Sequence, residues 1–285
     1  MYNNLSIILP AKNEAESLHT LLPRLRSVAE DAEIIVVNDG STDDTEDICK
    51  ANHAKVVTHS YSKGNGAAIK SGARNASKEI IIFMDADGQH DPAEIPAMLD
   101  LLNNGADMVI GARKPSTHAS FARRIANGIY NRLASILVGH KVNDLTSGFR
   151  AVRREAFLEF LYLLPNGFSY PTTITMCFFR AGYTIIYTPI EAAKRIGKSH
   201  INLFRDGARF LIIIFKIATL YSPLKLFLPI SLMHFLIASG YYFYTYITYS
   251  RFTNMSALLF VASILIFLIG LVSEQITALL YKEKS

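Results

Sequence analysis

Two long apolar stretches, at residues 226–248 and 257–280, limit the folds open to this chain more than any other feature. Each is long enough to cross, as a helix, a hydrocarbon core of about 30 Å. The short segment 251–254 between them, Arg-Phe-Thr-Asn, suits a turn. The sequence therefore predicts a hairpin of two transmembrane helices.

Basic residues flank the predicted hairpin unevenly. Lys216 and Lys225 precede the first span, Lys282 and Lys284 follow the second, and only Arg251 lies in the turn. Positively charged flanks stay on the cytoplasmic side of a membrane. We therefore expect an integral membrane protein with both termini, and the region before the hairpin, in the cytoplasm.

Up to about residue 190, short apolar runs alternate with stretches of helical periodicity, as in βα units around a mainly parallel sheet. The runs are rich in Ile, Val and Leu and have no interior proline, which suits strands covered by helices on both faces. They are residues 5–9, 33–37, 55–58, 79–84 and 107–111. We expect Asn13, Asp91 and either Ser41 or Thr42 to cap the helices that follow.

The segment 199–222 is apolar but carries Arg205, Arg209 and Lys216, which fall on one face of a helix. This pattern predicts an amphipathic helix in the membrane interface, with a helix packed on the preceding domain as the alternative. The expected organisation is an α/β domain at 1–198, an interface helix at 199–222 and the hairpin at 223–285.

Polar residues follow four of the predicted strands, at Asn13-Glu14, Asn38-Asp39-Gly40, Asp85-Ala86-Asp87 and Arg113. Ligands of open α/β sheets bind beyond the carboxyl ends of the strands. We therefore expect these residues to converge on one site.

The acidic segment Asp85-Ala86-Asp87 follows directly on an apolar run. Two carboxylates at the end of a buried strand repel each other unless a cation lies between them. Mg²⁺ and Mn²⁺ prefer such oxygen ligands and complete their shells with substrate phosphates. Asp-x-Asp alone is also common in solvated turns, so its place after a strand carries the prediction of a divalent metal site.

Three further features suit a phosphate-bearing ligand. Asp39 can accept a hydrogen bond from a nucleobase N–H, and Arg113 can neutralise a diphosphate or form only a surface ion pair. The Gly-rich turn 63–66, which begins with Lys63, can bring backbone amides to a phosphate, but its residue order excludes a Walker-type ATPase.

Charge and cysteine content narrow the function classes. The net charge is +5 and the basic residues form no continuous block, so nucleic acid is not an expected partner. Phosphate-bearing small molecules or an anionic membrane surface suit it better. Cys49 and Cys177 lack metal-ligand or redox spacing, which indicates core positions in a reducing compartment.

Together these motifs resemble those of the family-two glycosyltransferases of GT-A fold, specifically the dolichyl- and undecaprenyl-phosphate sugar synthases. The matching segments are residues 7–14, 37–41, 85–90, 111–113 and 144–150, in the same order and spacing over about residues 5–200. The resemblance implies a Rossmann-like, mainly parallel sheet, a nucleotide-diphosphate sugar as donor and a polyprenyl phosphate as acceptor, in a bacterial or archaeal inner membrane.

The resemblance also implies roles for individual residues. Asp87 and Gln89 would hold Mg²⁺ or Mn²⁺. The residues expected to bind the donor are Pro10, Ala11, Asn13, Glu14, Asp39, Lys63, Asp85, Ala86, Asp87 and Arg113. Those expected at the acceptor phosphate are Ser147, Arg195, Lys198 and Ser199. The expected catalytic set is Asp85, Asp87, Arg113, Arg195 and Lys198.

A phosphate monoester is anionic near neutral pH and can attack a sugar without a general base. The expected reaction is therefore an in-line displacement with inversion, from a UDP-linked hexose or N-acetylhexosamine. Asn38, His200 and the segment 169–172 depart from the family's usual residues. These departures leave the donor and the acceptor open.

Two other functions are compatible with this organisation. A processive polysaccharide synthase has a tryptophan in its Gln-x-x-Arg-Trp acceptor motif, whereas this chain has no tryptophan and one predicted hairpin. A noncatalytic membrane protein that binds sugar nucleotides would keep the fold without turnover. For any of these functions, the transmembrane region is the expected place for a homo-oligomer contact.

Overall fold

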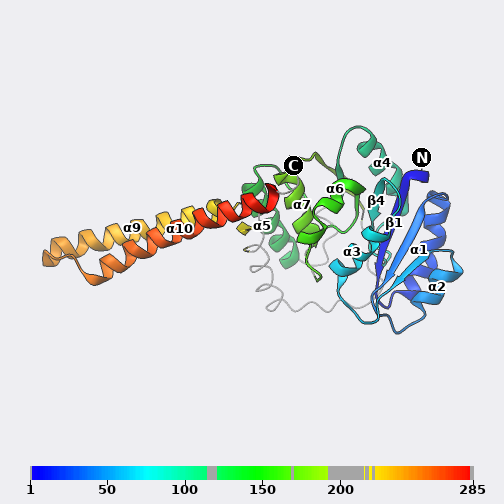
Figure 1. The fold of residues 1–285 in the computed structure, drawn as a ribbon, viewed down its shortest axis with the longest axis horizontal. Coiled ribbons are helices and arrows are strands. Elements are labelled where there is room, and N and C mark those ends of the chain that lie inside the picture. The colour runs from blue at the N-terminus through cyan, green and yellow to red at the C-terminus, as the bar shows by residue number, and fades with distance from the viewer. Residues whose placement is uncertain are drawn as a thin grey trace. The chain divides into compact units, whose positions relative to one another are not determined.

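The computed structural model describes residues 2–113, 121–167, 170–191, 215, 218–219 and 222–282 (Figure 1). The chain divides into two compact units, Met1–Asn202 and Leu203–Ser285. The first unit is an α/β domain and the second contains two long helices.

The described part of the first unit is built on a seven-stranded sheet in the order β3-β2-β1-β4-β6-β5-β7. Its strands are β1 (Leu5–Ala11), β2 (Glu33–Asn38), β3 (Lys55–Thr58), β4 (Ile80–Phe83), β5 (Met108–Arg113), β6 (Arg150–Arg153) and β7 (Ile185–Ile190). Strand β6 runs antiparallel to both of its neighbours, and the other pairs are parallel. The mainly parallel sheet is confirmed, and each predicted apolar run overlaps a strand.

Helices cover both faces of this sheet. The described helices of the first unit are α1 (Ala15–Val28), α2 (Thr45–Ala51), α3 (Asn65–Asn75), α4 (Ile95–Asn103), α5 (Phe121–Val138), α6 (Arg154–Glu159) and α7 (Tyr170–Arg180). Short 3-10 turns lie at η1 (Tyr2–Asn4), η2 (Pro92–Glu94) and η4 (Leu161–Leu163). Asp91 caps η2 as predicted, because its carboxylate accepts a hydrogen bond of 3.0 Å from the backbone N–H of Ala93.

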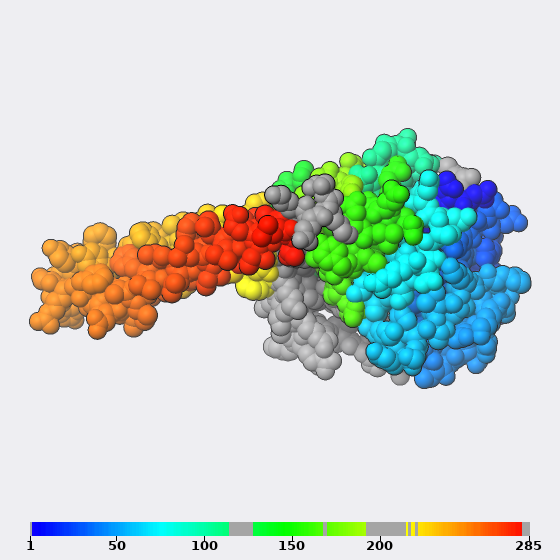
Figure 2. All heavy atoms as spheres, in the orientation of Figure 1, coloured from blue at the N-terminus to red at the C-terminus, as the bar shows by residue number. Residues whose placement is uncertain are grey.

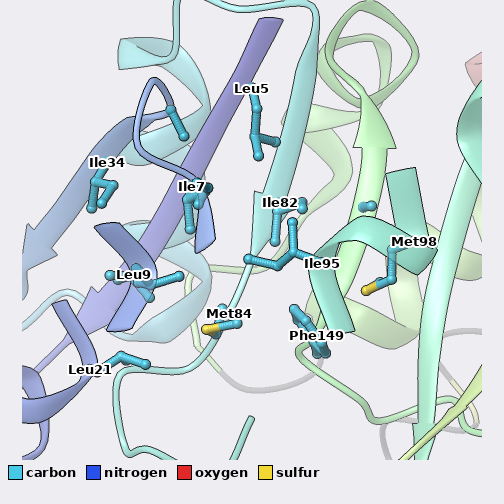
Figure 3. Close-up of a cluster of buried hydrophobic side chains, with 14 of the residues drawn as sticks. Leu5, Ile7, Leu9, Leu21, Ile34, Ile82, Met84, Ile95, Met98 and Phe149 are labelled. Atoms are coloured by element: carbon cyan, nitrogen blue, oxygen red, sulfur yellow. The ribbon is translucent and has the colours of Figure 1, made fainter. Parts of the chain in front are cut away.

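The core explains why β1 reads as a continuous apolar run. Leu5, Ile7 and Leu9 point to the face covered by α1 and α4, where they join one buried cluster (Figure 3). Ile8 points to the opposite face, where α3 lies over it. Successive side chains of a strand alternate between faces, so a central strand covered on both sides is apolar at nearly every position.

The second unit contains α9 (Pro223–Tyr249) and α10 (Asn254–Lys282), which pack along each other (Figure 2). Both helices are long and apolar enough to cross a membrane. Large apolar side chains such as Leu232, Ile247 and Leu258 are exposed, as expected of surfaces that contact lipid. The predicted pair of apolar helices joined by a short turn is confirmed.

Polar contacts inside this hairpin join its two helices. The hydroxyl of Ser231 donates to the carbonyl of Ser263 at 2.8 Å, and the hydroxyl of Ser263 donates to the carbonyl of Ser231 at 3.0 Å. The carboxylate of Glu274 accepts from the backbone N–H of Leu224 at 3.1 Å. That N–H belongs to the first turn of α9, where backbone donors have no partner within the helix.

The predicted interface helix at 199–222 lies mostly outside the described residues. Within it, Phe215, Ala218 and Thr219 are helical, and the Thr219 hydroxyl donates to the Phe215 carbonyl at 3.0 Å. The position of this helix in the membrane interface stays a prediction.

Candidate active site

The carboxyl ends of β1 and β2 lie side by side, with Ala11 opposite Asn38. The loops that follow them are joined by hydrogen bonds. The N–H of Asn13 donates to Ser41 Oγ at 3.0 Å, and the N–H of Thr42 donates to Asn13 Oδ1 at 2.8 Å. The predicted donor residues of these two loops are therefore neighbours.

The helix caps predicted in these loops are wrong. Helix α1 begins at Ala15 with Glu14 in the N-cap position, and α2 begins at Thr45 with Asp44 in that position. Asn13 instead adopts a left-handed backbone, with φ of 55°, and its side chain joins the two loops. Asn is one of the few residues that adopt this conformation readily.

Asp39 lies just beyond β2 and is 4% exposed. Its carboxylate accepts hydrogen bonds from His59 Nδ1, Ser62 Oγ and the backbone N–H groups of Lys63 and Gly64, all between 2.7 and 2.9 Å. Burial opposes the charged form, but these hydrogen bonds outweigh it and lower the pKa of Asp39. Asp39 therefore organises the loop 59–64, a role that the sequence did not predict.

Asp85 and Asp87 follow β4 at the same edge of the sheet. Asp87 is 8% exposed, and its Oδ1 accepts a hydrogen bond of 3.1 Å from the backbone N–H of Gln89. Asp85 lies with its Oδ2 3.6 Å from Nε2 of the buried His90. The residues predicted for the donor and the metal in this segment, Asp85, Ala86, Asp87 and Gln89, thus lie within one short turn.

Strand β6 brings a second loop to these carboxylates. Because β6 is antiparallel to β4 and β5, with Arg150 opposite both Phe83 and Ile110, the residues before it run beside the ends of both strands. A Cβ added at Gly148 would lie 2.6 Å from Asp85 Oδ2. The loop 144–149 is therefore packed against Asp85 at one end and lies beside Arg113 at the other.

Arg113 is held by that loop. Its Nε and Nη2 donate to the two carboxylate oxygens of Asp144 at 2.8 and 3.1 Å, and Nη2 also donates to Thr146 Oγ1 at 2.7 Å. Burial disfavours the charged form, but the bonds to Asp144 and the charges of Asp85 and Asp87 outweigh it and raise the pKa of Arg113. This is a partly buried, bidentate ion pair beside the acidic turn, not a surface pair.

Asp144 was not among the predicted site residues. Burial raises its pKa, but the hydrogen bond and charge of Arg113 outweigh burial and lower it. Its Oδ1 also accepts from the N–H groups of Thr146 and Ser147 at 3.0 and 3.1 Å. The order Asp-Leu-Thr-Ser is typical of such Asx turns, and this is the signal by which the sequence could have identified it.

The predicted acceptor residues are only partly described. Ser147 is fully buried, and its hydroxyl accepts a hydrogen bond from the N–H of Phe149 at 3.3 Å. Arg150, also buried, donates to the Ser147 carbonyl at 2.7 Å. Arg195, Lys198 and Ser199 lie outside the described residues, so their roles stay predictions.

The donor set suits a divalent cation with few protein ligands. Among the described residues, no group of three or more His, Cys, Asp or Glu side chains forms a metal cage. Mg²⁺ and related ions typically take one or two carboxylates and complete their shells with water and phosphate oxygens. The carboxylates of Asp85 and Asp87 and the amide of Gln89 fit this pattern.

A mainly parallel α/β sheet with paired carboxylates at the carboxyl end of β4 is the arrangement expected of a GT-A fold. The family model described as "Glycosyl transferase family 2" matches residues 6–161, and that described as "GtrB C-terminal hairpin" matches residues 222–279. The chain belongs to glycosyl transferase family 2.

Relatives of this chain cover most of its length. It is 30% identical over 228 residues to glycosyltransferase AglJ of Haloferax volcanii, and the aligned region covers 78% of this chain and 74% of AglJ. It is 28% identical to the dolichyl-phosphate hexose transferase of the same organism (73% and 90% covered). It is 29% identical to the polyprenol monophosphomannose synthase of Mycolicibacterium smegmatis (74% and 84% covered).

The same fold occurs in a crystal structure of glucosyl-3-phosphoglycerate synthase from Mycobacterium tuberculosis in complex with Mn²⁺, UDP-glucose and phosphoglyceric acid. The TM-score is 0.63, with 21% identity, over 75% of this chain and 79% of that one. At this identity the likeness concerns the fold alone.

Proposed function

We propose that this chain transfers a sugar from a nucleotide-diphosphate sugar to a polyprenyl phosphate, with inversion and with the help of Mg²⁺ or Mn²⁺. The observation that carries the proposal is the acidic turn Asp85–Gln89 beside the Asp144–Arg113 pair, in a family 2 domain followed by an apolar hairpin. Two relatives of this chain are named for such lipids, the dolichyl-phosphate hexose transferase and the polyprenol monophosphomannose synthase.

The leaving group in this reaction is a nucleoside diphosphate, whose negative charge grows as the bond to the sugar breaks. Arg113 provides a fixed positive charge, since Asp144 and Thr146 hold its guanidinium from one side. Charges positioned before the reaction stabilise developing charge without reorganisation. A divalent cation held by Asp87 and Gln89 would supply further charge stabilisation to the diphosphate.

The acceptor side of the proposal depends on the membrane. A polyprenyl phosphate keeps its chain in the bilayer and presents its phosphate at the surface, where Arg195, Lys198 and Ser199 are proposed to bind it. An anionic phosphate attacks without a general base, and a single displacement inverts the anomeric centre. We propose the same organisation as before, with a cytoplasmic domain at 1–198, an interface helix at 199–222 and a membrane hairpin at 223–285.

UDP-linked hexose or N-acetylhexosamine is the proposed donor. The test is incubation of the full chain in detergent with a polyprenyl phosphate, Mg²⁺ or Mn²⁺, and a panel of UDP- and GDP-sugars. One lipid-linked monosaccharide is the expected product. A long glycan would instead favour a processive synthase, and no product with any donor would contradict the proposed activity.

The metal role is tested with Asp87→Asn, which keeps the shape of the side chain but removes its charge. We expect turnover to fall at least about a hundredfold, while the variant still partitions into membranes. A variant with wild-type turnover and metal dependence would contradict the assignment of Asp87.

A further inference from the structure

His59 is a buried polar residue that the proposed reaction has not yet used. It follows β3, is 6% exposed, and its backbone N–H donates to the carbonyl of Asn38 at 2.9 Å. This places the imidazole between the end of β2 and helix α3.

Both ring nitrogens of His59 have partners. Nδ1 lies 2.7 Å from Asp39 Oδ1, and Nε2 lies 2.8 Å from Ser71 Oγ on α3. Because the pKa of Asp39 is lowered, its carboxylate is ionised at neutral pH and can only accept. Nδ1 therefore carries a hydrogen and donates a hydrogen bond to Asp39, and in the neutral ring Nε2 accepts a hydrogen bond from the Ser71 hydroxyl.

The order Ser71–His59–Asp39 is that of a hydrolase triad, but its surroundings do not suit a nucleophile. Ser71 lies in the interior of α3, where backbone N–H groups are engaged in the helix's own hydrogen bonds. Such a serine has no neighbouring amides for an oxyanion. The chain of contacts instead fixes the Asp39 carboxylate between β2 and α3.

Fixing Asp39 also fixes the loop 61–64. Its carboxylate accepts from Ser62 Oγ at 2.8 Å and from the N–H groups of Lys63 and Gly64 at 2.8 and 2.9 Å. The loop packs against the turn after β2, because a Cβ added at Gly40 would lie 2.8 Å from the backbone nitrogen of Ser62. The loop thus lies at the edge of the sheet where the predicted donor residues gather.

Two side chains of this loop suit a nucleotide. Tyr61 is 67% exposed, and the Nζ of Lys63 lies 5.6 Å from the centre of its ring. An exposed aromatic face can stack on a base, and an ammonium group can pair with a phosphate. Neither side chain is needed for the core.

We propose that His59 is a positioning residue for the donor nucleotide: through Asp39 it holds the loop 61–64 so that Tyr61 and Lys63 form a binding surface for a nucleoside diphosphate. The inference rests on the proposed function, because that function supplies the nucleotide. The inference adds to that function a residue, His59, that acts without contacting the ligand.

Two substitutions separate the contacts of His59. In His59→Asn the side-chain amide takes the place of Nδ1 and can still donate to Asp39, whereas in His59→Gln the amide lies near the position of Nε2 and can reach Ser71. The full chain in detergent with Mn²⁺ is titrated with UDP and with GDP, and the Michaelis constants for donor and lipid are measured separately. His19→Gln, at an exposed position on α1, is the matched control.

We expect His59→Gln to weaken nucleotide binding and to raise the donor KM by about tenfold or more, with the lipid KM unchanged. His59→Asn should stay within about threefold of the wild type. General loss of structure would raise both Michaelis constants and would not distinguish Asn from Gln. Ser62→Ala, which removes one donor to Asp39 at an exposed position, should weaken nucleotide binding and keeps the test open if His59→Gln does not fold.

The outcomes separate this inference from the proposed function. Wild-type chain that binds UDP or GDP while His59→Gln or Ser62→Ala binds equally well would overturn the inference alone. Wild-type chain that binds neither nucleotide would overturn both the inference and the proposed function. Equal losses in the Asn and Gln variants would also overturn it, because the contact with Asp39 would then not be the one that matters.

Discussion

Gly148 lies so close to Asp85 that a Cβ at position 148 would meet the carboxylate Oδ2 at 2.6 Å. The two residues are 63 positions apart in the sequence. Strand β6 brings them together, because its antiparallel pairing with β4 places the loop before β6 beside the end of β4. The position of the Asp85 carboxylate therefore depends on the absence of a side chain at residue 148.

Gly148→Ala tests this dependence. The methyl group must displace the carboxylate, and a misplacement of about 1 Å in an active site can reduce turnover about a hundredfold. We expect kcat to fall by that order, measured as lipid-linked sugar formed, with the fold retained by circular dichroism. Gly128→Ala is the control, because a Cβ there meets nothing within 4 Å. Equal activity of both variants would show that Asp85 tolerates displacement.

The Asp144–Arg113 pair supports a second prediction. Asp144→Asn keeps the shape of the side chain but removes the charge that pairs with Arg113 and one of its two strong acceptors. We expect kcat to fall about a hundredfold, since a misdirected guanidinium no longer stabilises the leaving group. Thr146→Ala, which removes a single neutral acceptor from Nη2, should cost only about fivefold.

The kinetic result for Asp144→Asn is read together with donor binding. If Asp144 acts by placing Arg113 against the diphosphate, the affinity for the free nucleoside diphosphate should fall together with kcat. A variant that binds UDP and GDP as the wild type does, and turns over at the same rate, would mean that Arg113 keeps its position without this partner.

These two predictions depend on contacts that could not be predicted from the sequence. The carboxyl-edge loops after β1, β2 and β4 were predictable, because apolar runs mark those strands and polar residues follow them. Strand β6 was not, since Arg150–Arg153 is short and has an arginine at each end. Without the pairing register of β6 with β4 and β5, nothing in the sequence indicates that Gly148 lies beside Asp85 or that Asp144 lies beside Arg113.

The hydrogen-bond partners of the loop side chains could not be predicted from the sequence either. Asn13 followed three residues later by Glu16 fits a helix cap equally well as it fits a loop-bridging residue. What decides between them is the Thr42 N–H, 29 positions away. Asp39 was likewise predicted as a ligand residue, whereas its four hydrogen-bond donors come from His59 and the loop 62–64. Local patterns cannot indicate such long-range partners.

Glu33 supports a prediction about stability and pH away from the site. Burial raises its pKa, but hydrogen bonds from Ser6 Oγ at 2.6 Å and from the N–H of Ser77 at 2.9 Å outweigh burial and lower it below 4.5. A carboxylate with a lowered pKa stabilises the fold at pH values above its unfolded pKa and loses that contribution as pH falls through the folded pKa.

Glu33→Gln should therefore be less stable than the wild type at neutral pH by about 1 to 2 kcal/mol, and the difference should shrink as the pH falls below about 4.5. Thermal unfolding of both chains in the same detergent across this pH range measures it. Turnover near neutral pH should be unchanged. A stability difference that stays constant down to acid pH would mean that the charge on Glu33 contributes nothing.

The hairpin supports the last prediction. Ser231 and Ser263 exchange hydrogen bonds between α9 and α10, each hydroxyl donating to the other residue's carbonyl. Hydrogen bonds between helices in a membrane are worth about 0.6 kcal/mol on average and at most about 1.7. Ser231→Ala should destabilise the hairpin by an amount in this range, measured by unfolding in mixed micelles.

The control for this pair lies on the same helix. Ser239 donates to Phe235 within α9 at 2.8 Å and makes the same kind of bond without crossing to α10, so Ser239→Ala should change hairpin stability little. The acceptor of each bond between Ser231 and Ser263 is a backbone carbonyl, which an alanine variant keeps. Each substitution therefore removes one bond, and the double variant Ser231→Ala and Ser263→Ala should lose about the sum of the two single losses, within about 0.5 kcal/mol. A double variant that is no less stable than either single variant would contradict two separate hydrogen bonds between the helices.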